Sequence, residues 1–244
     1  MLNSTYIYHV LGIIDAGNTC IKAGIFSGNE LLKNADFKAF GNELGQFFVT
    51  HNVKTVYLGS VIRNQFTDAR LTIVPYSTTH QLPITNKYLS PETLGVDRIA
   101  NAAAAYVLNR NKGPVLSIDM GTCIKFDVVD NEGNYLGGSI SPGLSMRLKA
   151  LHVFTQKLPE VEITHPAPLI GRNTQSSIAS GVFNGIAAEI SGMAEQYEAD
   201  FKGIKAFLTG GDAAYFTGKL KNNIFASPFL TMHGLNAIAR LNGL

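Results

Sequence analysis

Apolar positions along the chain follow two patterns, one typical of strands and one typical of helices. Short, largely apolar runs predict strands at 8–14, 23–26, 30–37, 53–58, 71–74, 114–118, 126–129, 135–143 and 206–208, of which 53–58 is β-branched. Apolar residues in helical spacing predict helices at 42–50, 64–69, 99–108, 144–154, 174–200 and 233–241. Strands that alternate with helices after an antiparallel start predict an α/β fold, a mixed sheet with helices on its faces.

One strand–turn–strand segment occurs twice. The first copy reads Ile14-Asp15-Ala16-Gly17-Asn18-Thr19-Cys20-Ile21-Lys22, and a shortened copy reads Ile118-Asp119-Met120-Gly121-Thr122-Cys123-Ile124-Lys125. Each copy lies between two predicted strands and therefore predicts a β-hairpin. Glycine lets backbone N–H groups approach an anion, threonine can donate to a phosphate oxygen, and aspartate can hold a cation. The repetition predicts a nucleotide cleft between two related halves, residues 1–110 and 111–244.

The composition is that of an ordinary globular protein. Hydrophobic residues make up 45% of the 244 residues and charged residues 16%, which is enough to build a sizeable core. Lysine and arginine number 20 against 18 aspartates and glutamates, without runs of like charge, so an extended nucleic-acid footprint has no support. We therefore expect small-molecule partners and no nucleic acid.

The two cysteines, Cys20 and Cys123, occupy matching places in the two turns. Two interpretations stay open, small residues packed beneath the turns or a disulfide across the cleft. So few cysteines favour a reducing compartment. No apolar stretch approaches the roughly 18 residues that span a bilayer, and residues 1–10 lack the pattern of a signal peptide. These features predict a cytoplasmic protein with no membrane partner.

The segment Gly95-Val96-Asp97-Arg98 directly precedes an alanine-rich predicted helix. Asp97 suits the positive end of the helix dipole, so it is either a plain capping or first-turn acid or a functional carboxylate. Arg98 has the wrong charge for this place, which costs roughly a few tenths of a kcal/mol unless an anion compensates. The pair predicts a cavity at this helix start that binds a carboxylate.

Two later segments carry glycines in unusual places. Gly181, Gly185 and Gly192 lie inside the longest predicted helix, where each costs about 1 kcal/mol relative to alanine, so we expect close packing against a sheet or a second copy of the chain. Thr174, at the start of this helix, is either its cap or a functional side chain. The turn Thr209-Gly210-Gly211-Asp212 is a weak signal for a nucleoside or phosphate near a helix start.

In their order and spacing these motifs resemble those of type III pantothenate kinases, members of the acetate and sugar kinase, heat-shock ATPase and actin superfamily. The resemblance covers nearly the whole chain. It rests on Asp15-Ala16-Gly17-Asn18-Thr19 with Lys22, Tyr88 with Pro91, Leu94-Gly95-Val96-Asp97-Arg98, Asp119-Met120-Gly121-Thr122 with Asp127, Gly137-Gly138-Ser139-Ile140-Ser141-Pro142-Gly143, Asn173-Thr174 and Gly210-Gly211-Asp212.

The resemblance implies an actin-like ATPase fold, two tandem ribonuclease H-like domains around a nucleotide cleft. It implies ATP-dependent phosphorylation of pantothenate to 4′-phosphopantothenate, the first step of coenzyme A biosynthesis. The implied cofactors are Mg²⁺ with the ATP and a monovalent cation, K⁺ or NH₄⁺. Members of the family are dimers, so the resemblance also implies a homodimer.

The same resemblance assigns roles to residues. Asp97 would accept the proton of the substrate hydroxyl. Pantothenate would be bound by Tyr88, Gly95, Val96, Asp97, Arg98 and Thr174. The ATP phosphates would be bound by Asp15, Ala16, Gly17, Asn18, Thr19, Cys20, Ile21, Lys22, Gly121 and Thr122. Asp119 would hold the monovalent cation, and Asp15 would hold Mg²⁺ directly or through water.

Two features depart from the family pattern. The family usually has threonine or serine where this chain has Lys125, whose ammonium either substitutes for part of the monovalent cation or points to solvent. We hypothesise a weaker potassium dependence than is usual in the family. The second departure is residues 1–6, which precede the usual family start and are either frayed or lie before the true start.

Two other functions stay open. A kinase of the same superfamily for another hydroxy acid or sugar would share both turns but would not need Tyr88 and Arg98 together. A nucleotide-binding regulatory protein would bind ATP without turnover, since related sequences have been described as accessory factors for transcription.

Overall fold

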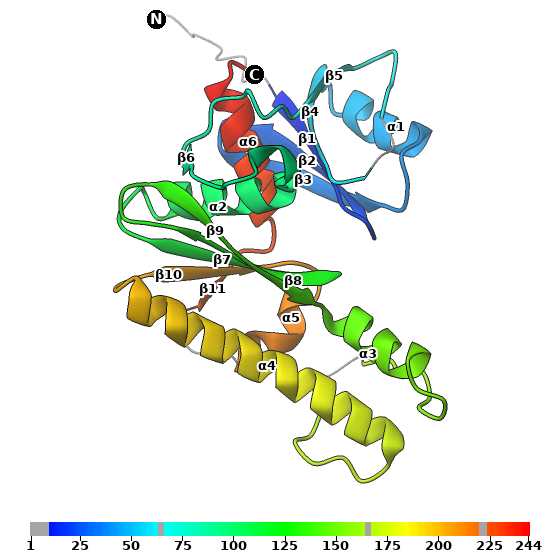
Figure 1. The fold of residues 1–244 in the computed structure, drawn as a ribbon. Helices are drawn as coiled ribbons and strands as arrows, with labels where there is room; N and C mark the ends of the chain where they lie inside the picture. The colour runs from blue at the N-terminus through cyan, green and yellow to red at the C-terminus, as the bar shows by residue number, and fades with distance from the viewer. Residues whose placement is uncertain (1–9, 63–65, 164–166, 220–223) are drawn as a thin grey trace, which may run out of the picture. The chain divides into compact units, whose positions relative to one another are not determined.

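The structure, a computed structural model, describes residues 10–62, 66–163, 167–219 and 224–244 (Figure 1). The N-terminal extension 1–6 considered above lies outside the described residues. The chain forms two compact units, the first comprising Met1–Pro83, Leu89–Ala104 and Leu230–Leu244 and the second comprising Ile84–Tyr88 and Ala105–Phe229. The division into halves 1–110 and 111–244 stays a prediction.

The first unit contains a five-stranded mixed sheet in the order β3-β2-β1-β4-β5. Its strands are β1 (Val10–Ala16), β2 (Ile21–Ser27), β3 (Glu30–Phe37), β4 (Thr55–Ser60) and β5 (Thr72–Pro75). β1, β2 and β3 pair antiparallel, whereas β4 pairs parallel with β1 and β5 parallel with β4. The first predicted hairpin is therefore confirmed as β1–β2.

Helix α1 (Asn42–Thr50) packs on one face of this sheet. Leu44 and Phe48, which are one helical turn apart, are fully buried in its core. A Cβ at Gly12 of β1 would lie 2.8 Å from the Phe48 ring, so glycine at this position lets the ring lie directly on the strand. The predicted helix at 42–50 is confirmed.

Helix α6 (Leu230–Leu241) packs on the first sheet through small residues. A Cβ at Gly24 of β2 would lie 2.9 Å from the Met232 sulfur, and one at Gly234 would overlap the backbone of Ala100. Ala100 belongs to α2 (Val96–Leu108), the predicted alanine-rich helix, which follows the short 3₁₀ turn η1 (Pro91–Thr93). Small side chains on β2, α2 and α6 therefore allow these backbones to approach closely.

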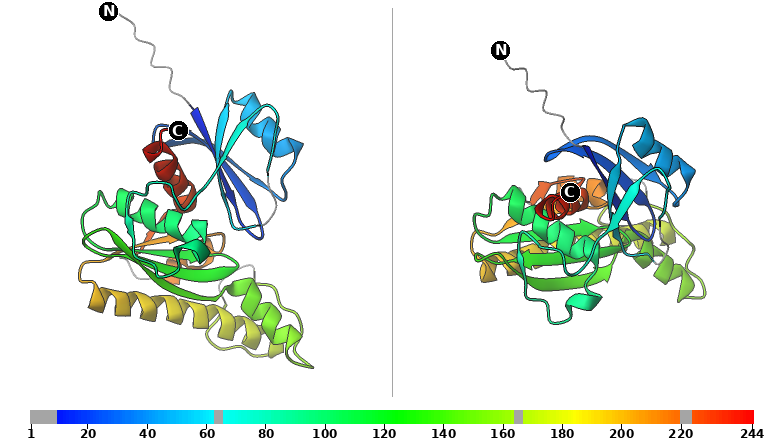
Figure 2. Two further views of the ribbon diagram at one scale, coloured as in Figure 1. Left: turned by 45° about the horizontal axis from the view of Figure 1, so that its top comes forward. Right: turned by 90° about the horizontal axis from the view of Figure 1, so that it is seen from above.

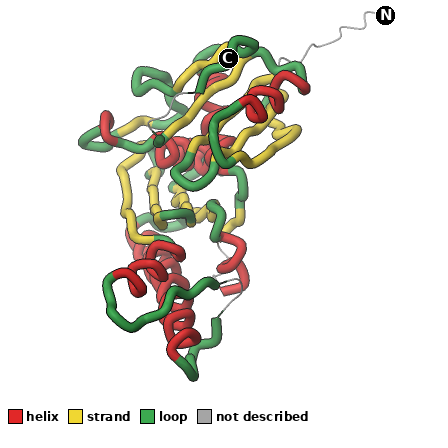
Figure 3. The backbone as a smooth tube through the Cα atoms, turned by 90° about the vertical axis from the view of Figure 1, so that its right-hand side faces the viewer, coloured by secondary structure: helices red, strands yellow, loops and turns green. Residues whose placement is uncertain are grey.

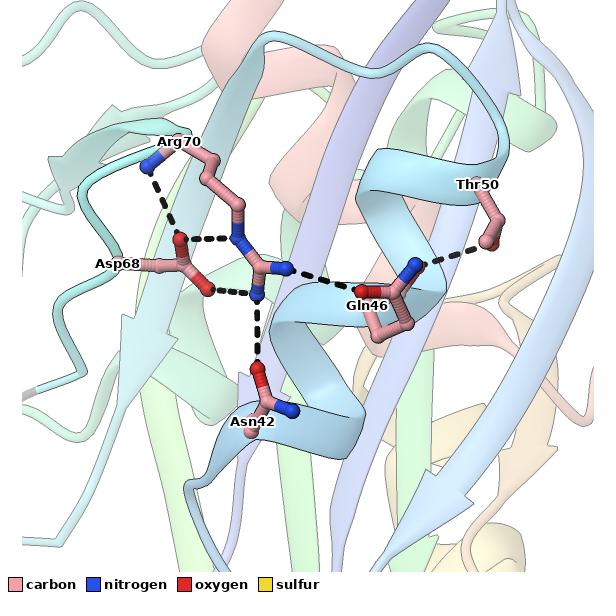
Figure 4. A network of polar contacts seen from close by, with 5 residues as sticks. All are labelled: Asn42, Gln46, Thr50, Asp68 and Arg70. Atoms are coloured by element: carbon pink, nitrogen blue, oxygen red, sulfur yellow. Dashed lines mark hydrogen bonds and ion pairs between the residues drawn. The ribbon is translucent and has the colours of Figure 1, made fainter.

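The helix predicted at 64–69 is wrong for residues 66–69, which are not helical, while 63–65 lie outside the described residues. Asp68 instead forms a local turn in which its Oδ1 accepts a hydrogen bond from the Arg70 N–H at 3.0 Å. The Arg70 guanidinium binds the same carboxylate at 2.9 and 2.7 Å and donates to Gln46 at 2.9 Å and Asn42 at 3.1 Å (Figure 4). Such side-chain bonds to nearby backbone compete with helix formation.

The second unit contains a six-stranded mixed sheet in the order β11-β10-β7-β8-β9-β6. Its strands are β6 (Thr85–Asn86), β7 (Val115–Met120), β8 (Cys123–Val129), β9 (Asn134–Pro142), β10 (Lys205–Thr209) and β11 (Ile224–Ala226). β7 pairs antiparallel with β8, which confirms the second predicted hairpin. β6 was not predicted, because its two polar residues carry no hydrophobic pattern; they pair with Asn134 and Tyr135 of β9.

Helices cover one face of the second sheet, as Figures 1 and 2 show for the long helix α4 (Thr174–Asp200). Phe183 of α4 is buried and stacks on Phe216 of α5 (Ala213–Phe216), with ring centroids 4.6 Å apart. Helix α3 (Leu144–Val153) contacts α4 (Figure 3), and the 3₁₀ turn η2 (Thr217–Lys219) follows α5. Within the described ranges, no helix is long and apolar enough to cross a membrane.

Candidate active site

The first turn joins β1 to β2 and presents polar groups at its tip. In the antiparallel register Asp15 lies opposite Lys22, and the turn is closed by a hydrogen bond from Gly17 N–H to the Cys20 carbonyl at 3.1 Å. Asn18 is exposed, as is Thr19, whereas Asp15 and Lys22 are half-buried. The turn therefore combines accessible hydroxyl, amide, carboxylate and ammonium groups.

Both cysteines are free thiols, so the disulfide interpretation is wrong. The Cys20 sulfur lies 3.7 Å from the Phe37 carbonyl oxygen on β3. Burial raises the pKa of the Cys20 thiol, an effect that the nearby Asp36 carboxylate reinforces. A thiol in this state is a poor nucleophile at neutral pH, which agrees with a packing role.

The second turn joins β7 to β8 and carries an ion pair. In this hairpin Asp119 lies opposite Lys125, and the Lys125 Nζ is 2.7 Å from the Asp119 Oδ2. Gly121 N–H closes the turn on the Cys123 carbonyl at 3.0 Å, and Thr122 is exposed at the tip. Of the two interpretations of Lys125, the one that pointed its side chain to solvent is therefore wrong.

Two other glycine turns pack against the second turn. Gly143 N–H donates to the Thr122 carbonyl at 3.0 Å, and a Cβ at Gly143 would overlap the Gly121 carbonyl oxygen. Asp212 N–H donates to the Met120 carbonyl at 3.0 Å. The segments Ser141-Pro142-Gly143 and Gly210-Gly211-Asp212, each ambiguous alone, thus meet at one turn.

Gly210 is required at this meeting point. Its φ of +98° lies in the left-handed region, and a Cβ there would overlap the Met120 backbone. The adjacent Asp212 is half-buried, and burial raises the pKa of its carboxyl. An acid with a raised pKa beside a phosphate-type turn is a candidate functional residue that the sequence motif alone flagged only weakly.

The start of α2 brings four of the predicted substrate residues together. The Asp97 carboxylate lies over Gly95, because a Cβ at Gly95 would be 2.5 Å from the Asp97 Oδ1. Asp97 is in the first helical turn and half-buried, as both of its interpretations allow. Arg98 is buried, with 6% of its surface exposed, and Val96 is buried beside it. An acid and a buried arginine thus occupy consecutive positions at one helix start.

Tyr88 belongs to the second unit and packs at the edge of its sheet. A Cβ at Gly137 would lie 3.1 Å from the Tyr88 ring, and the ring centroid of Tyr88 is 6.0 Å from that of Tyr135. The Tyr135 hydroxyl in turn donates to the buried Asp127 Oδ1 at 2.7 Å. Tyr88 is therefore positioned by the residues around Asp127, and it lies in a different unit from Asp97.

Thr174 is the first residue of α4 but does not cap it, so its capping interpretation is wrong. Asn173 is the cap residue: its side chain accepts from Ser176 N–H at 2.9 Å, and the Ser176 hydroxyl accepts from Asn173 N–H at 3.0 Å. Thr174 is exposed and lies on the wall of a hollow of about 630 Å³. This hollow is lined by Leu151, Leu158, Thr174, Ser177, Ile178, Gly181 and Val182.

Comparison with known proteins yields one family. The family model described as type III pantothenate kinase matches residues 13–196. The type III pantothenate kinases of Phocaeicola vulgatus and Christiangramia forsetii are 38% and 40% identical to this chain over 237 and 240 residues. Each alignment covers 94% of this chain and 98% of the relative.

Two solved structures share the fold at low sequence identity. A Campylobacter jejuni protein described as a Baf family transcriptional activator gives a TM-score of 0.54 at 19% identity, covering 96% of this chain and 97% of that one. The activator of the 2-hydroxyisocaproyl-CoA dehydratase from Clostridium difficile, with bound ADPNP, gives 0.53 at 12% identity, covering 96% of each chain. These likenesses confirm the predicted α/β fold of the actin-like ATPase class.

Proposed function

The chain belongs to the type III pantothenate kinase family, and we propose that Asp97 is the proton acceptor in its reaction. The reaction is ATP-dependent phosphorylation of pantothenate, in coenzyme A biosynthesis. One observation carries the proposal for Asp97: its carboxylate lies over Gly95 at the start of α2, directly before the buried Arg98. Gly95 leaves the space that this carboxylate occupies.

The demands of phosphoryl transfer suit such a carboxylate. The transition state is loose, so that the protein mainly positions the reactants and stabilises negative charge. Asp97 orients the primary hydroxyl of pantothenate and accepts its proton as the new P–O bond forms. The ionised form of such an acid is the form that accepts a proton.

Pantothenate carries a carboxylate, and Arg98 supplies a matching cation. A buried guanidinium makes strong charge-assisted hydrogen bonds, bidentate ones where the geometry permits. We assign the remaining substrate contacts to Gly95, Val96, Tyr88 and Thr174, as the family resemblance implies. The position of Arg98 directly after Asp97 supports recognition of a substrate with both a carboxylate and a hydroxyl.

The ATP phosphates are assigned to the two turns. The first turn contributes Asp15, Ala16, Gly17, Asn18, Thr19, Cys20, Ile21 and Lys22, and the second contributes Gly121 and Thr122. The exposed threonine hydroxyls and the tight backbone at both turns fit this role. Asp15, a half-buried carboxylate, fits an oxygen-preferring cation, and the magnesium it would hold screens the phosphate charge.

The monovalent cation, K⁺ or NH₄⁺, was assigned to Asp119. The residues present do not fit an added ion at that carboxylate, because the Lys125 ammonium already lies 2.7 Å from its Oδ2. No step of the proposed reaction is therefore derived through such an ion.

We also propose a homodimer in the cytoplasm, without nucleic-acid or membrane partners. A Cβ at Gly181, Gly185 or Gly192 on α4 would meet no atom within 4 Å, so these positions leave room for a second copy of the chain. Two free cysteines suit a reducing compartment. Sedimentation of the purified protein measures the oligomeric state.

The test of the function is release of ADP from ATP and Mg²⁺ that depends on pantothenate. Asp97→Asn keeps the size of the side chain but removes its basicity, so we expect turnover to fall by roughly 100-fold or more while ATP binding persists. Asp200→Asn, at the exposed end of α4, is the matched control and should keep full activity. A fully active Asp97→Asn would disprove the base assignment, and a wild-type protein without pantothenate-dependent ADP release would disprove the function.

The likeness to the Baf family protein favours a regulatory nucleotide-binding protein as the second candidate. Such a protein would bind ATP without turnover, so the same assay separates the two. A kinase for another hydroxy acid or sugar would turn over, but Arg98→Ala would then leave the KM of its preferred substrate unchanged, whereas for pantothenate we expect it to rise.

A further inference from the structure

We propose that Lys125 is a built-in monovalent cation of the second turn, so that nucleotide binding and turnover require neither K⁺ nor NH₄⁺. The inference rests on the proposed function for its meaning, since it concerns the turn assigned to ATP. It is carried by the geometry of one ion pair, Lys125 with Asp119.

The hairpin fixes this pair. Asp119 and Lys125 lie directly opposite each other in the antiparallel register of β7 and β8, and opposite side chains project from the same face of a sheet. The Nζ to Oδ2 distance of 2.7 Å is that of a charge-assisted hydrogen bond. The position of Lys125 is thus determined by strand pairing and not by a flexible loop.

Both members of the pair are largely withdrawn from water. The side chains of Lys125 and Asp119 are 18% and 14% exposed. A carboxylate with so little access to solvent needs a neighbouring positive charge, and an ammonium group supplies the same single charge as K⁺ or NH₄⁺. A lysine also brings this charge without dependence on the ionic composition of the medium.

A second cation at Asp119 would meet an opposing charge. Any K⁺ close enough to bind this carboxylate would lie a few ångströms from the Lys125 ammonium, and like charges at that separation repel. K⁺ also prefers oxygen ligands, whereas the lysine ammonium offers only N–H donors. The ion pair therefore replaces an ion site and does not complete one.

The primary test is nucleotide binding measured without pantothenate, by titration of ATP and Mg²⁺ in tetramethylammonium chloride or in KCl at equal ionic strength. A bound effector typically changes affinity by roughly 5- to 150-fold. For the wild-type protein we expect the Kd for ATP to differ by less than about twofold between the two salts, well below that range. The turnover rate with pantothenate should show the same indifference.

Lys125→Thr removes the built-in charge and leaves a hydroxyl, and Lys125→Met removes the charge while keeping most of the length. We expect Lys125→Thr to bind ATP at least about fivefold more weakly in tetramethylammonium chloride and to recover in KCl or NH₄Cl. Lys205→Thr, an exposed lysine of the same sheet, is the matched control and should behave as the wild type in every salt. Melting temperatures show whether each variant is folded.

Two results would overturn the proposal. One is a wild-type Kd for ATP that tightens fivefold or more in KCl but not in tetramethylammonium chloride. The other is a folded Lys125→Thr, together with a folded Lys125→Met, that binds ATP as the wild type does in both salts. Failure of pantothenate-dependent ADP release leaves these binding results intact, so it would disprove the proposed function without deciding this inference.

Discussion

The hairpins β1–β2 and β7–β8 repeat one arrangement of charge but differ in what surrounds it. Each places an aspartate near the end of its first strand opposite a lysine of its second, Asp15 with Lys22 and Asp119 with Lys125. The second turn is braced by the backbones of Gly143 and Gly210, whereas on the first turn Val61 N–H donates to the Ala16 carbonyl at 3.1 Å. Neighbouring backbone thus holds both turns, through two glycine segments at the second and through Val61 at the first.

The difference indicates a division of labour between two similar turns. A turn fixed by neighbouring backbone keeps its N–H groups pre-oriented toward a ligand, which avoids an ordering cost on binding. A turn that neighbouring backbone holds at fewer points can adjust to the ligand, at the cost of ordering it. We expect the second turn to act as the rigid phosphate contact and the first as the adjustable one.

The largest expected effect comes from adding a side chain at Gly210, whose backbone packs against the second turn. Gly210→Ala forces a left-handed φ on a residue with a Cβ and pushes that Cβ into the Met120 backbone, so we expect the free energy of unfolding to fall by about 2–5 kcal/mol. Gly17→Ala, within the first turn, leaves its Cβ 3.2 Å from the Cys20 carbonyl oxygen without such an overlap and should cost less than about 1 kcal/mol. Urea denaturation of both variants measures the difference.

Equal destabilisation by Gly17→Ala and Gly210→Ala would break the comparison. It would mean that the first turn is as tightly enclosed as the second. A Gly210→Ala protein of wild-type stability would show that the second turn is not tightly braced, because the overlap of the new Cβ with the Met120 backbone would then be relieved at no cost.

A smaller effect is expected from a difference within the strands. Two residues after the lysine, the second hairpin carries the buried acid Asp127 where the first carries Gly24. Tyr135→Phe removes the hydroxyl that donates to Asp127 at 2.7 Å, and we expect a loss of about 1.5–3 kcal/mol in the free energy of unfolding. Since the Tyr135 ring also lies beside Tyr88, the KM for pantothenate should rise while that for ATP stays unchanged.

The control for Tyr135→Phe is Tyr76→Phe in the first unit, because the Tyr76 hydroxyl bonds to no buried acid among the described residues. If Tyr135→Phe left both stability and the KM for pantothenate unchanged, the Tyr135–Asp127 hydrogen bond would not position Tyr88. The comparison would then reduce to the two turns alone.

The sequence predicts the helices and strands well, but it predicts the contacts between distant segments poorly. Both hairpins follow from apolar runs on each side of an Asp-x-Gly turn, and α4 from its apolar spacing, because these signals are local. The approach of Gly210 to Met120 is set by the parallel pairing of β10 with β7, which no local pattern encodes. For this reason Gly210-Gly211-Asp212 is only a weak signal for a nucleoside or phosphate in the sequence, and its contact with the second turn is seen only in the structure.

Predictions for single side chains failed where two local conformations were nearly equally favourable. Asn173 and Thr174 are both good cap residues, and the choice between them depends on where the helix begins, which the reciprocal bonds with Ser176 decide. Lys125 could extend into solvent or fold onto Asp119, and the hairpin register decided that. The prediction of a helix at 64–69 was wrong because the Asp68 carboxylate accepts a hydrogen bond from the Arg70 N–H, two residues further along the chain.

The smallest expected effect is a pH dependence confined to the first hairpin. His233 of α6 packs edge to face on Phe26 of β2, with ring centroids 5.4 Å apart, and burial lowers the pKa of His233 from its usual 6.5. Because the unfolded chain then binds more protons than the folded one below pH 6.5, stability falls as the pH drops from 6.5 toward the folded-state pKa. On the second hairpin, Phe126 instead stacks on the Tyr197 ring of α4 and not on a histidine. Amide hydrogen exchange, corrected for intrinsic rates, should therefore accelerate more in β1–β2 than in β7–β8 when the pH falls from 7 to 5. His233→Gln should abolish this difference between the hairpins. Equal acceleration in both hairpins would mean that another group causes the pH dependence.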